Sequence, residues 1–130
     1  MLITDDDEAF RETLASVFAP RGFNTVLAPD GVEALSIVRR EFVHVLLTDM
    51  NMPRMSGLEI IRQIRRAHLS LPCILISAGA DEQLVEEAGT DAFSILRKPI
   101  RFPEIANVVR DAMKVTYGWP EGPMEQTDNG

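Results

Sequence analysis

Five short apolar runs alternate with segments of helical periodicity, and this alternation constrains the fold more than any other feature of the chain. Short apolar runs between turn residues predict buried strands. Strands that alternate with helices predict an α/β fold, in which a parallel sheet with right-handed crossovers carries helices on both faces. The predicted strands are residues 1–4, 23–28, 43–48, 73–77 and 92–96, and the predicted helices are residues 8–19, 32–40, 57–67, a short acidic helix from 81, and 103–115.

Residues with strong preferences at helix ends set these boundaries. Asp30 and Asp81 carry side chains that cap helix N-termini. Pro20 and Gly22 are expected to end the first helix, and Pro103 suits the first turn of the last one. Residues 117–130 hold three glycines and two prolines without periodicity, which predicts a tail or the start of a linker. We therefore expect one domain over residues 1–116 and a tail over 117–130, and the short end slightly favours a stand-alone domain.

The charge and apolar content of the chain exclude several functional classes. A net charge of −7 and a pI near 4.8 argue against nucleic-acid binding by this domain. No apolar run approaches the ~20 residues of a membrane span, and the start lacks the features of a signal peptide. These features predict a cytoplasmic protein that does not bind a membrane. The single cysteine, Cys73, lies in an apolar run and is expected to be a buried thiol rather than a nucleophile.

The third apolar run stops at one carboxylate, Asp49, which is followed by the turn residues Asn51, Pro53 and Gly57. An aspartate at the carboxyl end of a buried strand lies where open α/β sheets place their ligand crevice. Taken alone, Asp49 is better explained as a loop residue that begins an Asx-turn. The residues at the ends of the other strands therefore decide whether Asp49 has a chemical role.

Polar side chains lie at the carboxyl ends of four of the five predicted strands. They are Asp5, Asp6 and Asp7 at the end of the first, Asp49 at the end of the third, Ser77 at the end of the fourth and Lys98 at the end of the fifth. Parallel strands end at one edge, so these groups can converge, and crowded carboxylates repel unless a cation is present. Mg²⁺ usually takes one or two carboxylates together with waters and a phosphate. Carboxylates, a hydroxyl and an ammonium are the set that an acceptor aspartate needs to receive a phosphoryl group.

Each of these residues also has a plainer explanation. Asp7 is best explained as a cap of the first helix, whereas Asp5 and Asp6 are better explained as metal ligands. Ser77 alone would be an exposed hydroxyl at a strand end, and Lys98 alone would be a solvated lysine before a proline. Their common edge favours a functional site over four separate coincidences.

Four segments of the chain resemble the receiver domain of response regulators in two-component signalling. They are ITDDD at 3–7, LTDMNMP at 47–53 with Ser56 and Gly57, ISA at 76–78 and RKP at 97–99. The resemblance covers residues 1 to about 116. It implies a flavodoxin-like, doubly wound sheet of five parallel strands in the order 2-1-3-4-5, flanked by five helices.

The resemblance also implies roles for the acidic residues. Asp49 matches the aspartate that accepts the phosphoryl group. Asp6, Asp49 and the backbone carbonyl of Asn51 would hold Mg²⁺, with Asp5 acting mainly through a water. Asn51 and Gly79 occupy the two flanking positions that modulate hydrolysis of the aspartyl phosphate in the family.

Three further positions complete the implied site. Ser77 matches the switch hydroxyl, and Lys98 matches the lysine that pairs with the aspartate or its phosphate. Pro99 matches the proline that follows this lysine through a cis peptide bond. Ile95 stands where the family usually has an aromatic switch residue, and Phe93, two residues earlier on the predicted strand, is not at the matching position. Coupling of Ser77 to an aromatic residue is therefore not expected in the usual form.

The implied partners are a histidine kinase or histidine phosphotransfer protein upstream and a protein target or effector domain downstream. Phosphorylation would switch the surface of the fourth helix, fifth strand and fifth helix, and a phosphorylation-dependent homodimer is compatible with this. One alternative is a receiver-like interaction module that works without phosphorylation, which only Ile95 supports. Another is a Mg²⁺-dependent aspartyl phosphohydrolase, which would need a general acid where Asn51 stands.

Overall fold

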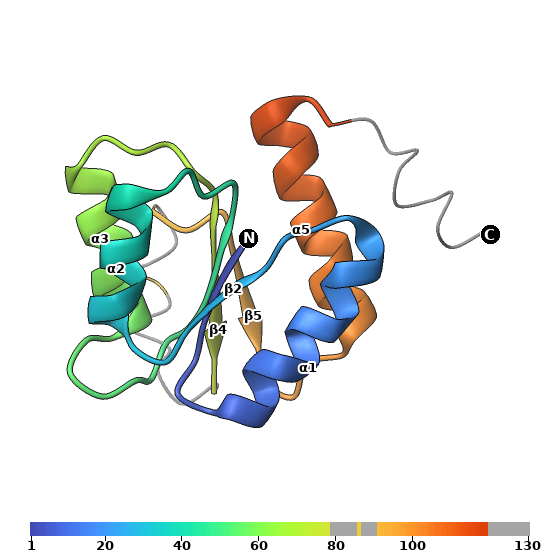
Figure 1. Ribbon diagram of the computed structural model, residues 1–130, viewed down its shortest axis with the longest axis horizontal. Coiled ribbons are helices and arrows are strands. Elements are labelled where there is room, and N and C mark those ends of the chain that lie inside the picture. The colour runs from blue at the N-terminus through green and yellow to red at the C-terminus, as the bar shows by residue number, and fades with distance from the viewer. Residues whose placement is uncertain (79–85, 87–90, 120–130) are drawn as a thin grey trace.

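The computed structural model of the protein describes residues 1–78, 86 and 91–119. A sheet lies at the centre of the molecule (Figure 1). It has five parallel strands in the order β2-β1-β3-β4-β5, so the predicted strand order is confirmed. The strands are β1 (Leu2–Thr4), β2 (Val26–Ala28), β3 (Leu46–Asp49), β4 (Cys73–Ser77) and β5 (Ser94–Arg97).

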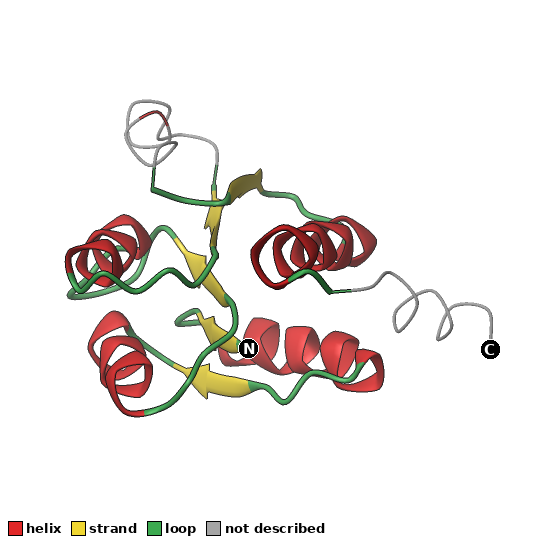
Figure 2. Ribbon diagram, turned by 90° about the horizontal axis from the view of Figure 1, so that it is seen from above, coloured by secondary structure: helices red, strands yellow, loops and turns green. Residues whose placement is uncertain are grey.

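Helices cover both faces of this sheet. Figure 2 shows α1 and α5 on one face and α2 and α3 on the other, as expected for a doubly wound fold. The helices are α1 (Glu8–Phe18), α2 (Gly31–Arg40), α3 (Gly57–Arg66) and α5 (Phe102–Tyr117), with a short 3₁₀ helix, η1 (Ala19–Arg21), after α1. Three predicted features lie outside the described residues: the helix from Asp81 apart from residue 86, the residue Gly79, and most of the tail, residues 120–130.

Aspartate side chains cap the N-termini of α1 and α2, as the sequence predicts. Asp7 Oδ1 accepts a hydrogen bond from the backbone N–H of Phe10 at 3.2 Å, which confirms Asp7 as the cap of α1. Asp30 Oδ1 accepts from the backbone N–H of Glu33 at 2.9 Å at the start of α2. Pro103 lies in the first turn of α5, where its missing N–H needs no partner.

Several element boundaries differ from the sequence predictions. α1 ends at Phe18, one residue earlier than predicted and two residues before Pro20, and η1 then leads to Gly22, with φ +87°, so Pro20 and Gly22 end the first helix as predicted. Phe23 still donates its backbone N–H to Phe18 O, so β2 begins later than predicted, at Val26. α5 continues to Tyr117, where Gly118 in the left-handed conformation ends it.

The third and fifth strands are also displaced from their predicted ranges. Leu46 is the first residue of β3 in register with both neighbours, opposite Leu2 and Cys73, so residues 43–45 precede the paired region. The first pair between β4 and β5 joins Ile74 to Ser94, so β5 begins at Ser94. Phe93 therefore lies just before the strand, although its backbone N–H donates to Cys73 O at 2.8 Å.

Two apolar clusters, one on each face of the sheet, hold the layers together. One lies beneath α2 and α3 and includes Ile37, Ile61 and Leu75. The other lies beneath α1 and α5 and includes Phe18 and Val109. Cys73 is fully buried, and burial raises the pKa of its thiol to about 11, in keeping with an inert core residue. Within the described part of the chain, no helix has the length and apolar character required to span a bilayer.

Candidate functional site

The strand register brings Asp5 and Asp49 side by side at one edge of the sheet. Thr4, the last residue of β1, is in register with Thr48 on β3. Asp5 directly follows Thr4, and Asp49 directly follows Thr48. Both side chains are buried, with Asp5 2% exposed and Asp49 5% exposed. Burying two neighbouring carboxylates is costly unless a counter-charge balances them.

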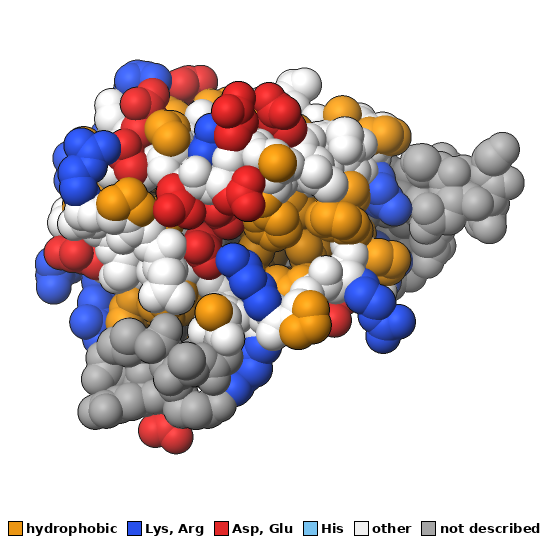
Figure 3. All heavy atoms as spheres, turned by 90° about the horizontal axis from the view of Figure 1, so that it is seen from below, with side chains coloured by type: hydrophobic (Ala, Val, Ile, Leu, Met, Phe, Trp, Pro, Cys, Tyr) orange, Lys and Arg blue, Asp and Glu red, His pale blue; other side chains and the backbone are white. Residues whose placement is uncertain are grey.

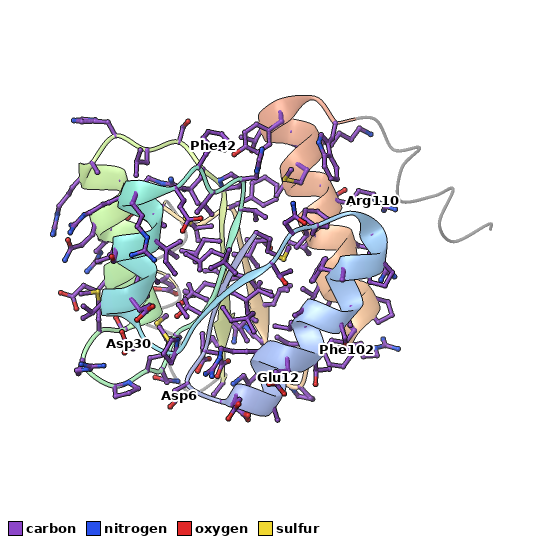
Figure 4. The ribbon with its side chains drawn as sticks, viewed as in Figure 1. Asp6, Glu12, Asp30, Phe42, Phe102 and Arg110 are labelled. Atoms are coloured by element: carbon purple, nitrogen blue, oxygen red, sulfur yellow. The ribbon has the colours of Figure 1, made fainter. Side chains whose placement is uncertain are left out.

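Asp6 joins these two residues to form a cluster of three carboxylates. One oxygen from each of Asp5, Asp6 and Asp49 lies within 4.8 Å of the others. Figure 3 looks onto this edge of the molecule and shows acidic side chains gathered across its middle. Asp6 is exposed and lies at the lower edge in Figure 4, so the cluster opens to solvent on its side.

Lys98 supplies the positive charge nearest to Asp49 among the ion pairs of the described residues. Its Nζ lies 3.4 Å from Asp49 Oδ1, which is an ion-pair distance but long for a hydrogen bond, and its side chain is 41% exposed. The same ammonium lies 5.6 Å from the centre of the Phe10 ring, within reach of a cation–π contact. The Lys98–Pro99 peptide bond is cis, as the resemblance implies.

Ser77 lies at the buried end of β4, next to the acidic cluster. Its neighbour Ile76 is in register with Asp49, and its own register partner is Arg97, the residue before Lys98. Ser77 O accepts a hydrogen bond from the Lys98 backbone N–H at 2.8 Å. Because Ser77 is fully buried, its explanation as an exposed hydroxyl at a strand end is wrong.

The loop after β3 closes tightly around the backbone of Asp49. Gly57 donates its N–H to Met50 O at 2.9 Å. A Cβ at Gly57 would lie only 2.3 Å from Asp49 O and 2.8 Å from Leu75 Cδ1, so the start of α3 touches the main chain of Asp49. Asn51 lies in this loop, two residues beyond Asp49, and is exposed.

Ile95 is half-buried and packs against the apolar cluster beneath α2 and α3. Phe93 is 37% exposed and lies outside β5. The structure thus places no aromatic ring at the position of Ile95, in line with the departure seen in the sequence.

Arg11 is one contact of the site that the sequence did not reveal. Its Nη1 donates to Asp5 O at 2.6 Å, so α1 reaches back to hold the loop that carries Asp5 and Asp6. Asp5 Oδ1 in turn accepts from the backbone N–H of Asp7 at 2.9 Å. An arginine on an exposed helix gives no sequence signal for such a contact, because its side chain can extend in several directions.

Burial is the main cause of abnormal ionisation in the cluster. It raises the pKa of Asp5 from 3.8 to about 6, against the opposing hydrogen bond from Asp7, and the neighbouring charge of Asp49 raises it further. Burial likewise raises the pKa of Asp49, while the charge of Lys98 and its contact with the carboxylate lower it. Both carboxylates therefore gain from a nearby cation at neutral pH.

The donor set fits Mg²⁺. Asp5 Oδ2 and Asp49 Oδ1 are buried without a hydrogen-bond partner among the described residues. Carboxylate oxygens converge there with an open side at Asp6, and Mg²⁺ prefers oxygen ligands with several waters retained. The resemblance to receiver domains implies a Mg²⁺ site at these three carboxylates.

Asp5→Asn is expected to stabilise the protein at pH 8 when a chelator removes divalent cations. A pKa raised to about 6 in the folded state gives stability that is present below pH 4 and is lost as the pH rises through 6. The full penalty, about 3 kcal/mol from the shift in pKa, then applies at pH 8. Asparagine keeps an oxygen to accept the Asp7 N–H but carries no charge. Urea unfolding at pH 4.5 and pH 8 measures the gain, which must shrink at the lower pH, and a gain that does not change with pH would contradict this prediction.

A family model described as response regulator receiver domain matches residues 1–110. The chain is 37% identical over 118 residues to response regulator MprA of Mycobacterium leprae (strain TN), covering 89% of this chain and 51% of that protein. It is 35% identical over 125 residues to response regulator MprA of Mycobacterium sp. (strain KMS), covering 95% of this chain and 54% of that protein. The chain thus spans about half the length of these curated relatives.

Solved structures agree with this match. The receiver domain of the Francisella response regulator 1452 superposes with a TM-score of 0.82 at 27% identity, covering 88% of this chain and 96% of that one. The signal receiver domain of an HD domain-containing protein from Pseudomonas fluorescens Pf-5 has a TM-score of 0.84 at 22% identity, covering 91% and 96% of the two chains, and supports the fold alone. The family match extends from β1 into α5, across every strand that contributes to the acidic edge, and the chain belongs to the response regulator receiver domains of two-component signalling.

Proposed function

We propose that Asp49 accepts a phosphoryl group from the phosphohistidine of a histidine kinase or histidine phosphotransfer protein. The observation that carries this proposal is the placement of Asp49, a buried carboxylate at a strand end, between two further aspartates and the ammonium of Lys98. Receiver domains are phosphoryl acceptors rather than enzymes, and the transfer chemistry fits this set. The Asp49 oxygen forms a bond to phosphorus as the bond from phosphorus to the histidine nitrogen breaks, giving an acyl phosphate and a free histidine.

Each residue of the site has a defined part in this step. Mg²⁺, held by Asp6, Asp49 and the carbonyl of Asn51, with Asp5 acting through a water, would neutralise charge on the transferring oxygens. Lys98 contributes a second positive charge, at the ion-pair distance that it already has to Asp49.

The phosphorylated state differs from the resting state mainly in charge. An acyl phosphate places about two negative charges at a position where the resting protein has one carboxylate. Ser77 and Lys98 move toward these oxygens, and the loop after β4 carries the change to the surface of the fourth helix, β5 and α5. The fourth helix lies outside the described residues. Because Ile95 replaces the usual aromatic residue, the readout relies on the loop and Ser77 rather than on an aromatic flip.

The aspartyl phosphate is expected to hydrolyse slowly by attack of water. Asn51 is exposed next to the site, and Gly79, the other position proposed to set the rate, lies outside the described residues. We attribute to the chain at most this slow autophosphatase activity.

The partners and the wider protein are part of the same proposal. Since the chain spans about half the length of its curated relatives, we propose that the switched surface acts on a downstream effector domain or protein target, or on a second copy of the domain. We also propose that residues 1–116 form the receiver unit and that it acts in the cytoplasm.

A direct test uses a small phosphodonor in place of the kinase. The protein is incubated with Mg²⁺ and the donor, and intact mass is compared with that of Asp49→Ala. The expected result is one phosphoryl adduct in the unaltered chain, lost both in the variant and after chelation of Mg²⁺. Absence of an adduct that depends on Mg²⁺, or an equal adduct in Asp49→Ala, would reject the proposal. Retained target binding without any adduct would favour the interaction module instead.

A further inference from the structure

An ion pair joins the loop after β3 to the start of α2. Arg54 Nη2, in the loop that carries Asn51, contacts Asp30 Oδ2. Asp30 Oδ1 already caps α2 through the Glu33 N–H, so the two carboxylate oxygens serve different partners. The Asp30 side chain is only 15% exposed, whereas the Arg54 side chain is 67% exposed. Solvent therefore screens this ion pair less than a pair in which both side chains are fully exposed.

The backbone of Arg54 has a conformation that an arginine rarely adopts. Its φ is +69°, and the Met55 N–H donates to Pro53 O at 2.8 Å across it. A hydrogen bond from residue i+2 back to residue i defines a γ-turn, and the form with positive φ is rare and strained. A non-glycine residue keeps such a conformation only where its surroundings fix it.

Two further contacts hold the same loop, one at the start of α2 and one at the end of β1. Met55 packs against Gly31, the first residue of α2, because a Cβ at Gly31 would lie 2.9 Å from Met55 Cβ. Thr4 Oγ1 lies 3.6 Å from Met52 Sδ and 3.4 Å from Asp30 O, within reach of either as a donor. Asn51 lies between Asp49 and these anchored residues, so its orientation depends on how the loop is held.

We propose that Arg54 is a positioning residue, which by pairing with Asp30 holds the loop so that the Asn51 carbonyl faces the cation held by Asp6 and Asp49. The pair thereby sets the affinity of the resting protein for Mg²⁺. This inference rests on the proposed function, because that function supplies the role of Asn51.

The direction in which Arg54→Ala changes the Mg²⁺ affinity distinguishes a positioning role from a purely electrostatic effect of the Arg54 charge. Removal of a positive charge from the protein can only strengthen its electrostatic attraction for a divalent cation. Loss of the Arg54–Asp30 contact, which we call the brace of the Asn51 loop, weakens Mg²⁺ binding instead, because the Asn51 carbonyl is less often in position as a ligand. Arg54→Ala therefore tightens Mg²⁺ binding if the charge alone matters and weakens it if the brace matters.

Isothermal titration calorimetry of the full chain with Mg²⁺ tests the brace. We expect Arg54→Ala to raise the Mg²⁺ dissociation constant about two- to fivefold, the effect of one partly exposed ion pair. Asp30→Asn, which keeps a good capping side chain, is expected to give a similar increase. The double variant is expected to bind Mg²⁺ no more weakly than whichever single variant binds it less tightly, because both substitutions break the same Arg54–Asp30 pair. Arg54→Lys keeps a charge for Asp30 and is expected to restore most of the affinity.

Arg40→Ala is the matched control. Arg40 and Arg54 line the same surface cavity, but Arg40 contacts Ser36 and Glu41 on its own side and not the loop. Its replacement removes the same charge and is expected not to raise the dissociation constant. Hydrogen exchange of the amides at residues 50–57 gives a readout independent of Mg²⁺, and it is expected to be faster in Arg54→Ala but not in Arg40→Ala.

Tighter or unchanged Mg²⁺ binding in Arg54→Ala, or fully additive effects in the double variant, would overturn the inference. If the unaltered protein binds Mg²⁺ but forms no adduct at Asp49, the proposed phosphoryl-acceptor function is rejected. The titration of the variants still decides whether Arg54 positions the loop. If the unaltered protein binds no Mg²⁺, the inference falls together with the cation site.

Discussion

Gly57→Ala is expected to lower the free energy of unfolding by about 3 kcal/mol, at the upper end of the cost of overpacking a core. The added Cβ would lie 2.3 Å from Asp49 O and 2.8 Å from Leu75 Cδ1, and the first of these is a backbone atom that cannot swing away. In an open helical position the same change would instead stabilise by up to about 1 kcal/mol, because alanine is the better helix former. The cost of the clash exceeds this gain. A lower free energy of unfolding in Gly57→Ala would therefore be evidence for the close contact with Asp49.

The same substitution is expected to slow phosphorylation, because relief of the clash must move α3 or the main chain of Asp49. Urea unfolding measures the stability, and the rate of adduct formation with a small phosphodonor measures the second effect. Gly118→Ala is the control, since Gly118 has φ +69° but no atom within 4 Å of an added Cβ. It is expected to cost about 1 kcal/mol for the left-handed backbone and to leave the phosphorylation rate unchanged. A smaller loss of stability at Gly57 than at Gly118 would show that the close approach to Asp49 is not rigid.

The arrangement of the acidic edge follows from the sequence because it depends on local patterns. Short apolar runs, each ended by a polar residue, identify where strands stop, and parallel strands must then end at one edge. The register of Thr4 with Thr48 shows how directly this works, because it places Asp5 beside Asp49. The strand order came from the family resemblance, since apolar runs alone do not say which strands are neighbours.

The features that the sequence did not predict depend on contacts that hydropathy and spacing do not show. β2 starts late because Phe23 remains bonded to the end of the first helical segment, a competition that hydropathy does not show. Ser77 ends β4, a central strand between β3 and β5, and is buried rather than exposed. The Arg54–Asp30 pair joins residues far apart in the chain, so neither helical spacing nor strand alternation reveals it.

Lys98→Met is expected to slow formation of the Asp49 adduct by about 100-fold, the effect of removing one preorganised charge from a reacting oxygen. Methionine has a similar length, so the change removes the ammonium while it keeps most of the packing near Phe10. The charge of Lys98 also opposes the burial that raises the pKa of Asp49. Without this charge, Asp49 stays protonated to a higher pH, and the pH profile of adduct formation is expected to move upward.

The two contacts of Lys98 make different predictions for this variant. A cation–π contact at 5.6 Å from Phe10 would matter for packing and stability but not for the ionisation of Asp49. The ion pair at 3.4 Å acts on the Asp49 carboxylate itself, so only this contact moves both the rate and the pH profile. Lys114→Met, at the only other lysine of the chain, in the last turn of α5, is the matched control and is expected to change neither. A slower rate with an unmoved pH profile would mean that Lys98 acts through packing, and an unchanged rate would remove Lys98 from the transfer step.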